Sequence, residues 1–212
     1  MAKARDVEGL DPGTPFARAA ACAVSVRAEE LFDHSADVLD TQDIERVHDM
    51  RVATRRLRAV LEIFAPCFPE DQHRPVLKDV KRLADALGAR RDPDVQIEAL
   101  DRVAGVMRKV EAPGLEAFAA RLRDEQEAGN ETLAAALQEA RDGALPDRLR
   151  ALAAAAQRRA DEAEAQAEAQ AEEEVAAQDG GFADADADAD ADAGTGGPGD
   201  GAPAADKEPA AP

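Results

Sequence analysis

The stretch VHDMRVATRRLRAVLEIF (47–64) decides the fold of this chain of 212 residues. At about 100° per residue its large apolar side chains fall on one side of an α-helix, in a stripe of the width that faces a protein core. These core-facing residues are Val47, Met50, Leu57, Leu61 and Phe64. The stretch therefore predicts an amphipathic helix, which we expect to begin near residue 43 and to end before Pro66 and Pro69.

A ladder of basic residues occupies the adjoining sector of this helix. Its members, spaced by three, four and three residues, are His48, Arg51, Arg55 and Arg58. They extend over roughly 15 Å, and the only acid in line with them is Glu62, at the far end. Like charges at these spacings destabilise a helix by roughly 0.2–0.5 kcal/mol per pair. An unrelieved basic ladder is what a polyanion site requires, because arginine forks bind phosphate oxygens in pairs.

A second basic face follows on a helix expected at 74–87. Its basic residues, and two that follow them, are Lys78, Lys81, Arg82, Arg90 and Arg91. Arg56 points away from the ladder. The alternative is a solvated surface whose charges pair with acids of other helices, such as Glu29, Glu30 or Asp94. Both interpretations stay open from the pattern alone.

The rest of the chain also predicts helices, at 16–39, 92–110, 115–141 and 146–178, and no segment alternates as a strand does. We expect Gly88 to end the helix at 74–87, Asp92-Pro93 to start the next, and a kink or restart near Gly129. The helix at 146–178 has few large apolar residues, so we expect it to be loosely docked or to project. The predicted fold class is all-α, a helical bundle.

Charge and composition divide the chain into four parts. We expect a disordered leader at 1–13, the bundle at 14–142, an Ala/Glu-rich helix at 146–178 and a disordered acidic tail at 179–212. The formal net charge is −19, but residues 160–212 hold 16 acids and one base, whereas residues 46–91 hold 11 Lys/Arg and six Asp/Glu. The tail can bury too little apolar area to offset the backbone entropy lost on folding, about 1–2 kcal/mol per residue.

Several function classes are not supported by the sequence. Cys22 and Cys67 suggest no disulfide framework, and no apolar stretch resembles a signal peptide or a membrane span, so we expect a cytoplasmic protein that does not enter the membrane. His34, His48 and His73 lack metal-site spacing. No nucleophile with a base and no phosphate-binding glycine loop is visible. We therefore expect no enzyme, no metal and no cofactor.

The basic segments resemble a known family. VHDMRVATRRLRAVLEIF (47–64) followed by LKDVKRLADALGARRDPDVQIEAL (77–100) is similar to the first half of a CHAD domain, the conserved histidine α-helical domain. The matching motifs are His48-x-x-Arg51, Arg55-Arg56-Leu57-Arg58 and Leu87-Gly88-x-x-Arg91-Asp92-x-Asp94-Val95. The resemblance covers residues 14–142, one half-repeat of the family.

The resemblance implies a pair of helical bundles with basic residues along the groove or pore between them. It also implies binding of inorganic polyphosphate and localisation to polyphosphate granules. The phosphate contacts it implies are His48, Arg51, Arg55, Arg56, Arg58, Lys78, Lys81, Arg82, Arg90 and Arg91. Asp92 and Asp94 are interpreted as structural acids at a helix N-terminus.

The second half of the family pattern is missing after residue 110. That region has no histidine, and its one double base, Arg158-Arg159, leads into an acidic run. Either a homodimer supplies the second half, or the site is degenerate. The alternatives are therefore a helical protein-interaction or structural domain and a non-specific nucleic-acid binder. Nucleic acid is disfavoured, because no aromatic residue lies near the basic ladder to stack on bases.

The acidic tail has three interpretations. It could keep the protein soluble, or act as an internal polyanion that competes for the basic segment. Calcium binding by Asp184, Asp186 and Asp188 is the third and weakest, because the Gly and Glu of a calcium-binding loop are absent.

Overall fold

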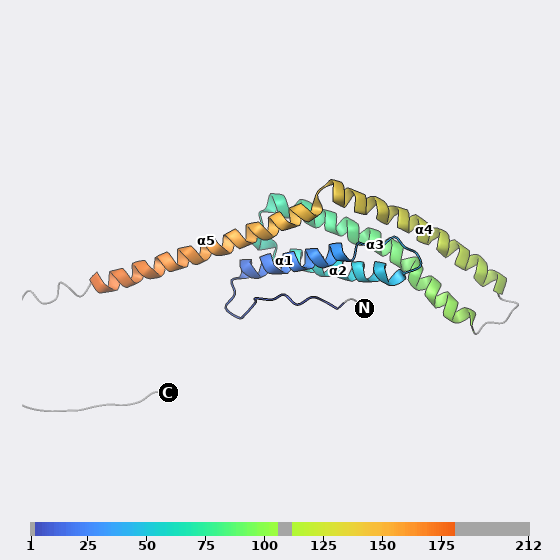
Figure 1. Cartoon of the computed structure of the whole chain (residues 1–212), viewed down its shortest axis with the longest axis horizontal. Helices are drawn as coiled ribbons and strands as arrows, with labels where there is room; N and C mark the ends of the chain where they lie inside the picture. The colour runs from blue at the N-terminus through green and yellow to red at the C-terminus, as the bar shows by residue number, and fades with distance from the viewer. Residues whose placement is uncertain (1–2, 106–111, 181–212) are drawn as a thin grey trace, which may run out of the picture. The chain divides into compact units, whose positions relative to one another are not determined.

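The computed structural model describes residues 3–105 and 112–180. Within them the fold is all-α, as predicted, and contains no strand (Figure 1). Its elements are α1 (Phe16–Asp33), α2 (Ile44–Ile63), the 3₁₀ helix η1 (Ala65–Cys67), α3 (Glu70–Ala104), α4 (Ala112–Asp142) and α5 (Leu145–Gly180). The chain divides into two compact units, 1–167 and 168–212, and the packing described below lies in the first. The predicted tail lies outside the described residues from 181 onward.

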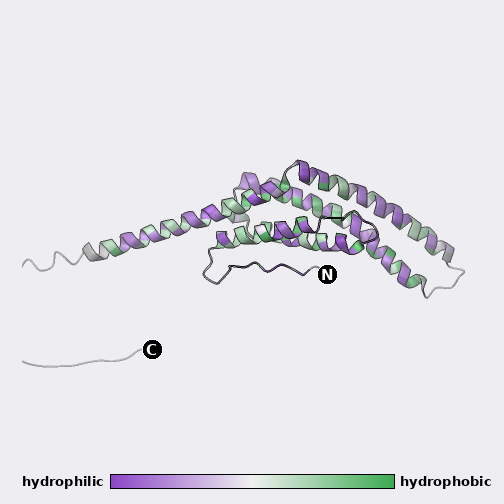
Figure 2. Ribbon diagram, in the orientation of Figure 1, coloured by the Kyte–Doolittle hydropathy of each residue, from purple (hydrophilic) through white to green (hydrophobic). Residues whose placement is uncertain are grey.

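The core is built from Leu, Val and Ala side chains of all five helices. The predicted apolar stripe of α2 is confirmed, since Val47, Met50, Leu57 and Leu61 are completely buried. Phe64 is half-buried and its ring lies 4.7 Å from that of Phe16. Each helix carries both hydrophobic and hydrophilic residues along its length, as Figure 2 shows. This mixture lets each helix bury one side and expose the other.

The prediction that a break separates two helices near Gly88 and Pro93 is wrong. α3 is a single helix from Glu70 to Ala104, with Pro75 and Pro93 inside it. Gly88 does not have the positive φ that a glycine ending a helix adopts. Pro93 is buried, and it removes only the hydrogen bond to the Ala89 carbonyl. Packing against other helices outweighs this local loss, so α3 continues.

The expectation of a loosely docked helix after residue 146 is also wrong for its first half. Leu145, Leu149, Leu152 and Ala156 of α5 are completely buried. Alanines contribute to this buried face, with Ala153 and Ala156 both buried, so few large residues are needed to join the core. Polar contacts reinforce this docking, since Arg148 Nη1 lies 2.6 Å from Asp79 Oδ2 on α3.

Two segments before α2 also differ from expectation. α1 ends at Asp33 rather than near residue 39, and the chain turns at Ser35, whose hydroxyl donates to the Phe32 carbonyl at 2.6 Å. Residues 1–13 were expected to be a disordered leader. From residue 3 the structure describes this segment, in which the Arg5 backbone N–H donates to Glu30 and its guanidinium pairs with Asp33 on α1.

α3 and α4 lie side by side (Figure 1), and their backbones are in close contact at Gly129. α4 does not restart there, because it is continuous from Ala112 to Asp142. A Cβ atom at position 129 would lie 3.0 Å from the Ala89 carbonyl oxygen and 3.0 Å from the Arg90 Cα. The carbonyl that Pro93 cannot bond thus packs against an α4 residue that has no side chain.

We predict that Gly129→Ala and Gly88→Ala change stability in opposite directions. Both replace a helical glycine, which by propensity alone stabilises a helix by about 0.5–1 kcal/mol. At position 88 a Cβ meets no atom within 4 Å, so this gain is realised. At position 129 it meets backbone, and overpacking of this kind costs about 1–3 kcal/mol.

Urea unfolding followed by far-UV circular dichroism measures the difference. Gly88→Ala should raise the free energy of unfolding and Gly129→Ala should lower it. An increase for both variants would mean that the two helices are not in close contact at this point.

Candidate polyanion-binding groove

α2 and α3 are joined through η1 and lie side by side, and each presents a polar face with the same spacing. Positions recur at intervals of three and four residues, which keeps them on one side of a helix. The α2 face consists of His48, Arg51, Arg55, Arg58 and Glu62, and the α3 face of Lys78, Lys81, Asp85, Gly88 and Asp92. The sequence identified the first face and the two lysines of the second.

A groove of about 500 Å³ separates these faces along their middle part. Its lining residues are Arg51, Arg55 and Arg58 from α2 and Ala84, Asp85, Gly88, Ala89 and Asp92 from α3. The small α3 residues leave room between the helices. Arg51 and Arg55 are exposed and make no hydrogen bond or ion pair with any described residue. Two guanidinium groups are therefore available to an anion.

At one end of the groove the carboxylate of Glu62 bridges the two helices. It accepts a hydrogen bond from Arg58 Nε at 3.0 Å and lies 3.1 Å from Lys81 Nζ. The hydrogen bond from Arg58, and next the one from Lys81, lower the pKa of Glu62 despite some desolvation. Arg58 and Lys81, both predicted to contact phosphate, are thus brought together, but they share the carboxylate of Glu62.

Two further acids face the predicted arginines. Asp85 and Asp92 line the groove and are exposed, and neither forms an ion pair with a described residue. Because α3 is continuous, Asp92 is not the N-cap of a helix, as the sequence suggested, but a mid-helix residue. The two faces together carry five Lys/Arg and three carboxylates. Asp85 already lies in the helix predicted at 74–87, and the antiparallel packing of α2 on α3 places it opposite the ladder, whereas Asp92 joins this face because α3 is continuous.

Other predicted contacts lie elsewhere. Arg82 pairs with Glu139 on α4, and this hydrogen bond raises the pKa of Arg82. Burial raises the pKa of Glu30, but a hydrogen bond from the Arg5 backbone and the charges of Arg27 and Arg56 lower it overall. Arg56 thus acts on α1, which agrees with its predicted position off the ladder.

Two other predicted contacts lie on the faces of the groove. Lys78 is exposed at the end of the α3 face, and His48 is half-buried one turn before Arg51.

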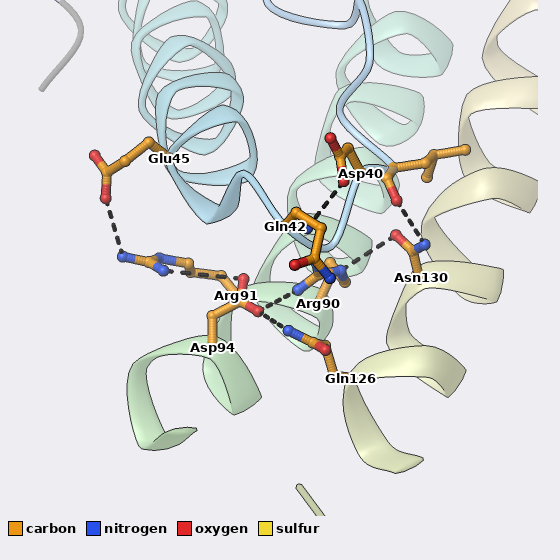
Figure 3. A network of polar contacts seen from close by, with 9 residues as sticks. Asp40, Gln42, Glu45, Arg90, Arg91, Asp94, Gln126 and Asn130 are labelled. Atoms are coloured by element: carbon orange, nitrogen blue, oxygen red, sulfur yellow. Dashed lines mark hydrogen bonds and ion pairs between the residues drawn. The ribbon is translucent and has the colours of Figure 1, made fainter. Parts of the chain in front are cut away.

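Arg90 is completely buried and forms an ion pair with Asp94 (Figure 3). Its Nε donates to Asn130 Oδ1 at 3.2 Å, and Gln126 Nε2 donates to Asp94 Oδ1 at 2.6 Å. Asn130 in turn donates from Nδ2 to the Leu39 carbonyl at 2.9 Å. The network joins α3 to α4 and to the α1–α2 connection. Arg90, predicted to contact phosphate, therefore has no exposed surface with which to do so.

Arg91 belongs to the same network. Its side chain is 11% exposed and lies 3.9 Å from both Glu45 and Asp94 (Figure 3). Three buried atoms near this point lack a hydrogen-bond partner, namely Arg90 Nη2, Arg91 Nη1 and Asp94 Oδ2. Among the described residues, Asp94 is thus the one buried carboxylate near the charges of both Arg90 and Arg91, because Glu45, the other acid near Arg91, is largely exposed.

The remaining histidines have structural positions. His34 follows the end of α1, and His73 is buried, with its Nε2 2.9 Å from the Leu61 carbonyl and its ring stacked on Phe68. Among residues 3–105 and 112–180, no group of three metal-ligating side chains is close enough to hold an ion. Nor does any helix in this part of the chain have the length and apolarity to span a membrane.

A model of the CHAD domain family matches residues 22–194. This interval covers most of the chain and extends beyond the residues 14–142 on which the sequence resemblance rested. It includes the groove, the buried network and the docked half of α5. Neither a curated protein nor a solved structure matches the chain.

We predict that Asp94→Asn destabilises the protein by about 3–5 kcal/mol, the cost of leaving a buried charge without its partner. Asp92→Asn, two residues earlier and exposed, is the matched control and should change stability by no more than about 0.5 kcal/mol. Urea unfolding of both variants measures the difference. Similar stabilities would contradict a structural role for the Arg90–Asp94 pair.

Proposed function

The chain belongs to the CHAD family, and we propose that it binds inorganic polyphosphate along the groove between α2 and α3 without catalysing a reaction. The family is associated with polyphosphate binding in general. The observation that carries the proposal for this chain is the pair Arg51 and Arg55, exposed in a groove and unpaired with any described residue.

The chemistry of the groove suits a chain of phosphates. Each guanidinium can donate two parallel hydrogen bonds to phosphate oxygens, and the charge on both partners strengthens them. Several weak contacts along one ligand add up, because each bound phosphate holds the next at high effective concentration. Binding should weaken steeply with salt, since counterions released on binding drive it.

We propose a smaller set of phosphate contacts than the resemblance implies, on the basis of the burial and pairing of the side chains. We retain His48, Arg51, Arg55, Arg58, Lys78 and Lys81, which lie on the facing sides of α2 and α3. Arg90 and Arg91 hold α3 in place, and Arg82 is engaged by Glu139. Arg56 interacts with Glu30. These four are therefore left out of the proposed contacts.

A homodimer could present two such grooves to one polyphosphate chain. This remains a proposal, motivated by the absence of a second basic half in the sequence. Localisation to polyphosphate granules would follow from the same binding. Light scattering with and without polyphosphate would show whether the mass doubles when the ligand is added.

We predict that Arg51→Ala, Arg55→Ala and Arg58→Ala together weaken polyphosphate binding at least 100-fold. Three charge-assisted contacts are lost, and a hydrogen bond to a charged group contributes about 1.5–3 kcal/mol. Binding can be measured by competition against a labelled polyphosphate. The slope of log K against log salt should also become shallower, because fewer phosphates are neutralised.

The control removes three other exposed arginines, Arg121, Arg123 and Arg150, and so changes the net charge equally. We expect only a small loss of affinity from it. Equal losses in the two triple variants would mean that net charge, and not the groove, binds polyphosphate. A DNA duplex that competes as well as polyphosphate would favour non-specific nucleic-acid binding.

A further inference from the structure

We infer that Arg58 and Lys81 form a second phosphate subsite, which the carboxylate of Glu62 occupies in the free protein. The inference rests on the proposed function. It distinguishes two parts of the groove, which differ in whether an anion must first be displaced. Arg51 and Arg55 are open to ligand, whereas the subsite at Arg58 and Lys81 binds phosphate only after Glu62 leaves it.

The geometry places a carboxylate where a phosphoryl group would bind. Glu62 receives a hydrogen bond from Arg58 Nε at 3.0 Å and lies 3.1 Å from Lys81 Nζ, so one anion bridges cations of two helices. Phosphate binds the same donors with the same preference for charge, and it offers more oxygens and more charge than a carboxylate. Glu62 therefore acts as an internal substitute for the ligand.

The two ion pairs are weak enough to open. All three side chains are 42–44% exposed, and exposed ion pairs contribute little to stability. The order of charges within α2 is also the less favourable one, because the arginine precedes the glutamate along the helix. Glu62 thus has a small structural role, and its release costs the fold little.

The position of the subsite makes its opening depend on chain length. Arg51 and Glu62 are 11 residues apart in α2, which corresponds to roughly 16 Å along the helix axis. A tripolyphosphate bound at Arg51 and Arg55 is too short to reach Glu62. A long chain bound at the same arginines presents its next phosphates to Arg58 and Lys81 at high effective concentration and can displace the carboxylate.

Asp85 provides a matched control for the charge of Glu62. It also lies in the groove and also faces the arginines of α2, but it forms no ion pair with a described residue. Asp85→Asn therefore changes the net charge of the groove as Glu62→Gln does, without freeing Arg58 or Lys81. Glu70→Gln removes a similar exposed pair, with Arg74, outside the groove.

The test compares these three variants with the wild-type full-length chain, using isothermal titration calorimetry with tripolyphosphate and with long-chain polyphosphate. Glu62→Gln should strengthen binding of the long chain by about 3- to 10-fold, the range expected when two exposed ion pairs no longer compete. Tripolyphosphate should change by no more than twofold. Asp85→Asn should give a smaller gain, similar for both ligands, and Glu70→Gln no gain.

A second measurement shows whether the gain requires the subsite. In a background of Arg58→Ala with Lys81→Ala, Glu62→Gln should have no more effect than Asp85→Asn. Equal gains from Glu62→Gln and Asp85→Asn in the wild-type background, or weaker binding by Glu62→Gln, would overturn the inference while leaving the proposed function intact. Absence of polyphosphate binding by the wild type and every variant would overturn the proposed function itself.

Discussion

The buried ion pair between Arg90 and Asp94 is the contact on which the rest of the arrangement depends. It lies where α3 passes α4, beside the glycine that allows the two backbones to approach. Asn130 extends it to the connection before α2. α3 stays one helix through Pro93, where this pair and the contacts with α4 lie, so the α3 residues from Lys78 to Asp92 stay in line with the basic ladder of α2. The groove exists only because α3 does not break.

The arginines of the basic segment have different roles, although they look alike in the sequence. Residues 46–91 carry a formal charge of +5, but burial and pairing divide these cations among separate tasks. Arg90 stabilises the crossing of α3 with α4, and Arg91 lies near Glu45 on α2 and Asp94. Arg82 joins α3 to α4, and Arg56 interacts with α1. Of the ladder residues, Arg51 and Arg55 are the two that are exposed and make no ion pair or hydrogen bond with a described residue. Their local environment, rather than the acidic net charge, determines what can bind, because charges beyond about 8 Å are screened at physiological salt.

The class of fold and the α2 helix could be predicted because their signals are local. The apolar stripe at Val47, Met50 and Leu57 specifies which side of α2 is buried, and the basic ladder follows from the same periodicity. The continuity of α3 could not be predicted, since Gly88 and Asp92-Pro93 are ordinary signals for a break and contacts with α4 override them. The docking of α5 could not be predicted, because its buried face consists largely of alanines, which give a weak hydrophobic pattern. The role of Arg90 could not be predicted, because its partner Asn130 lies 40 residues away in the sequence. The two groove aspartates face the ladder only through the packing of α3 against α2, which the sequence of neither helix shows by itself.

The most direct test of this division is the nuclear magnetic resonance spectrum of the arginine Nε–H groups during a titration with polyphosphate. We expect shifts for Arg51, Arg55 and Arg58, and unchanged signals for the buried Arg90 and for the remote Arg121. Shifts at Arg121 as large as those on α2 would mean that the groove is no better a phosphate site than any exposed arginine.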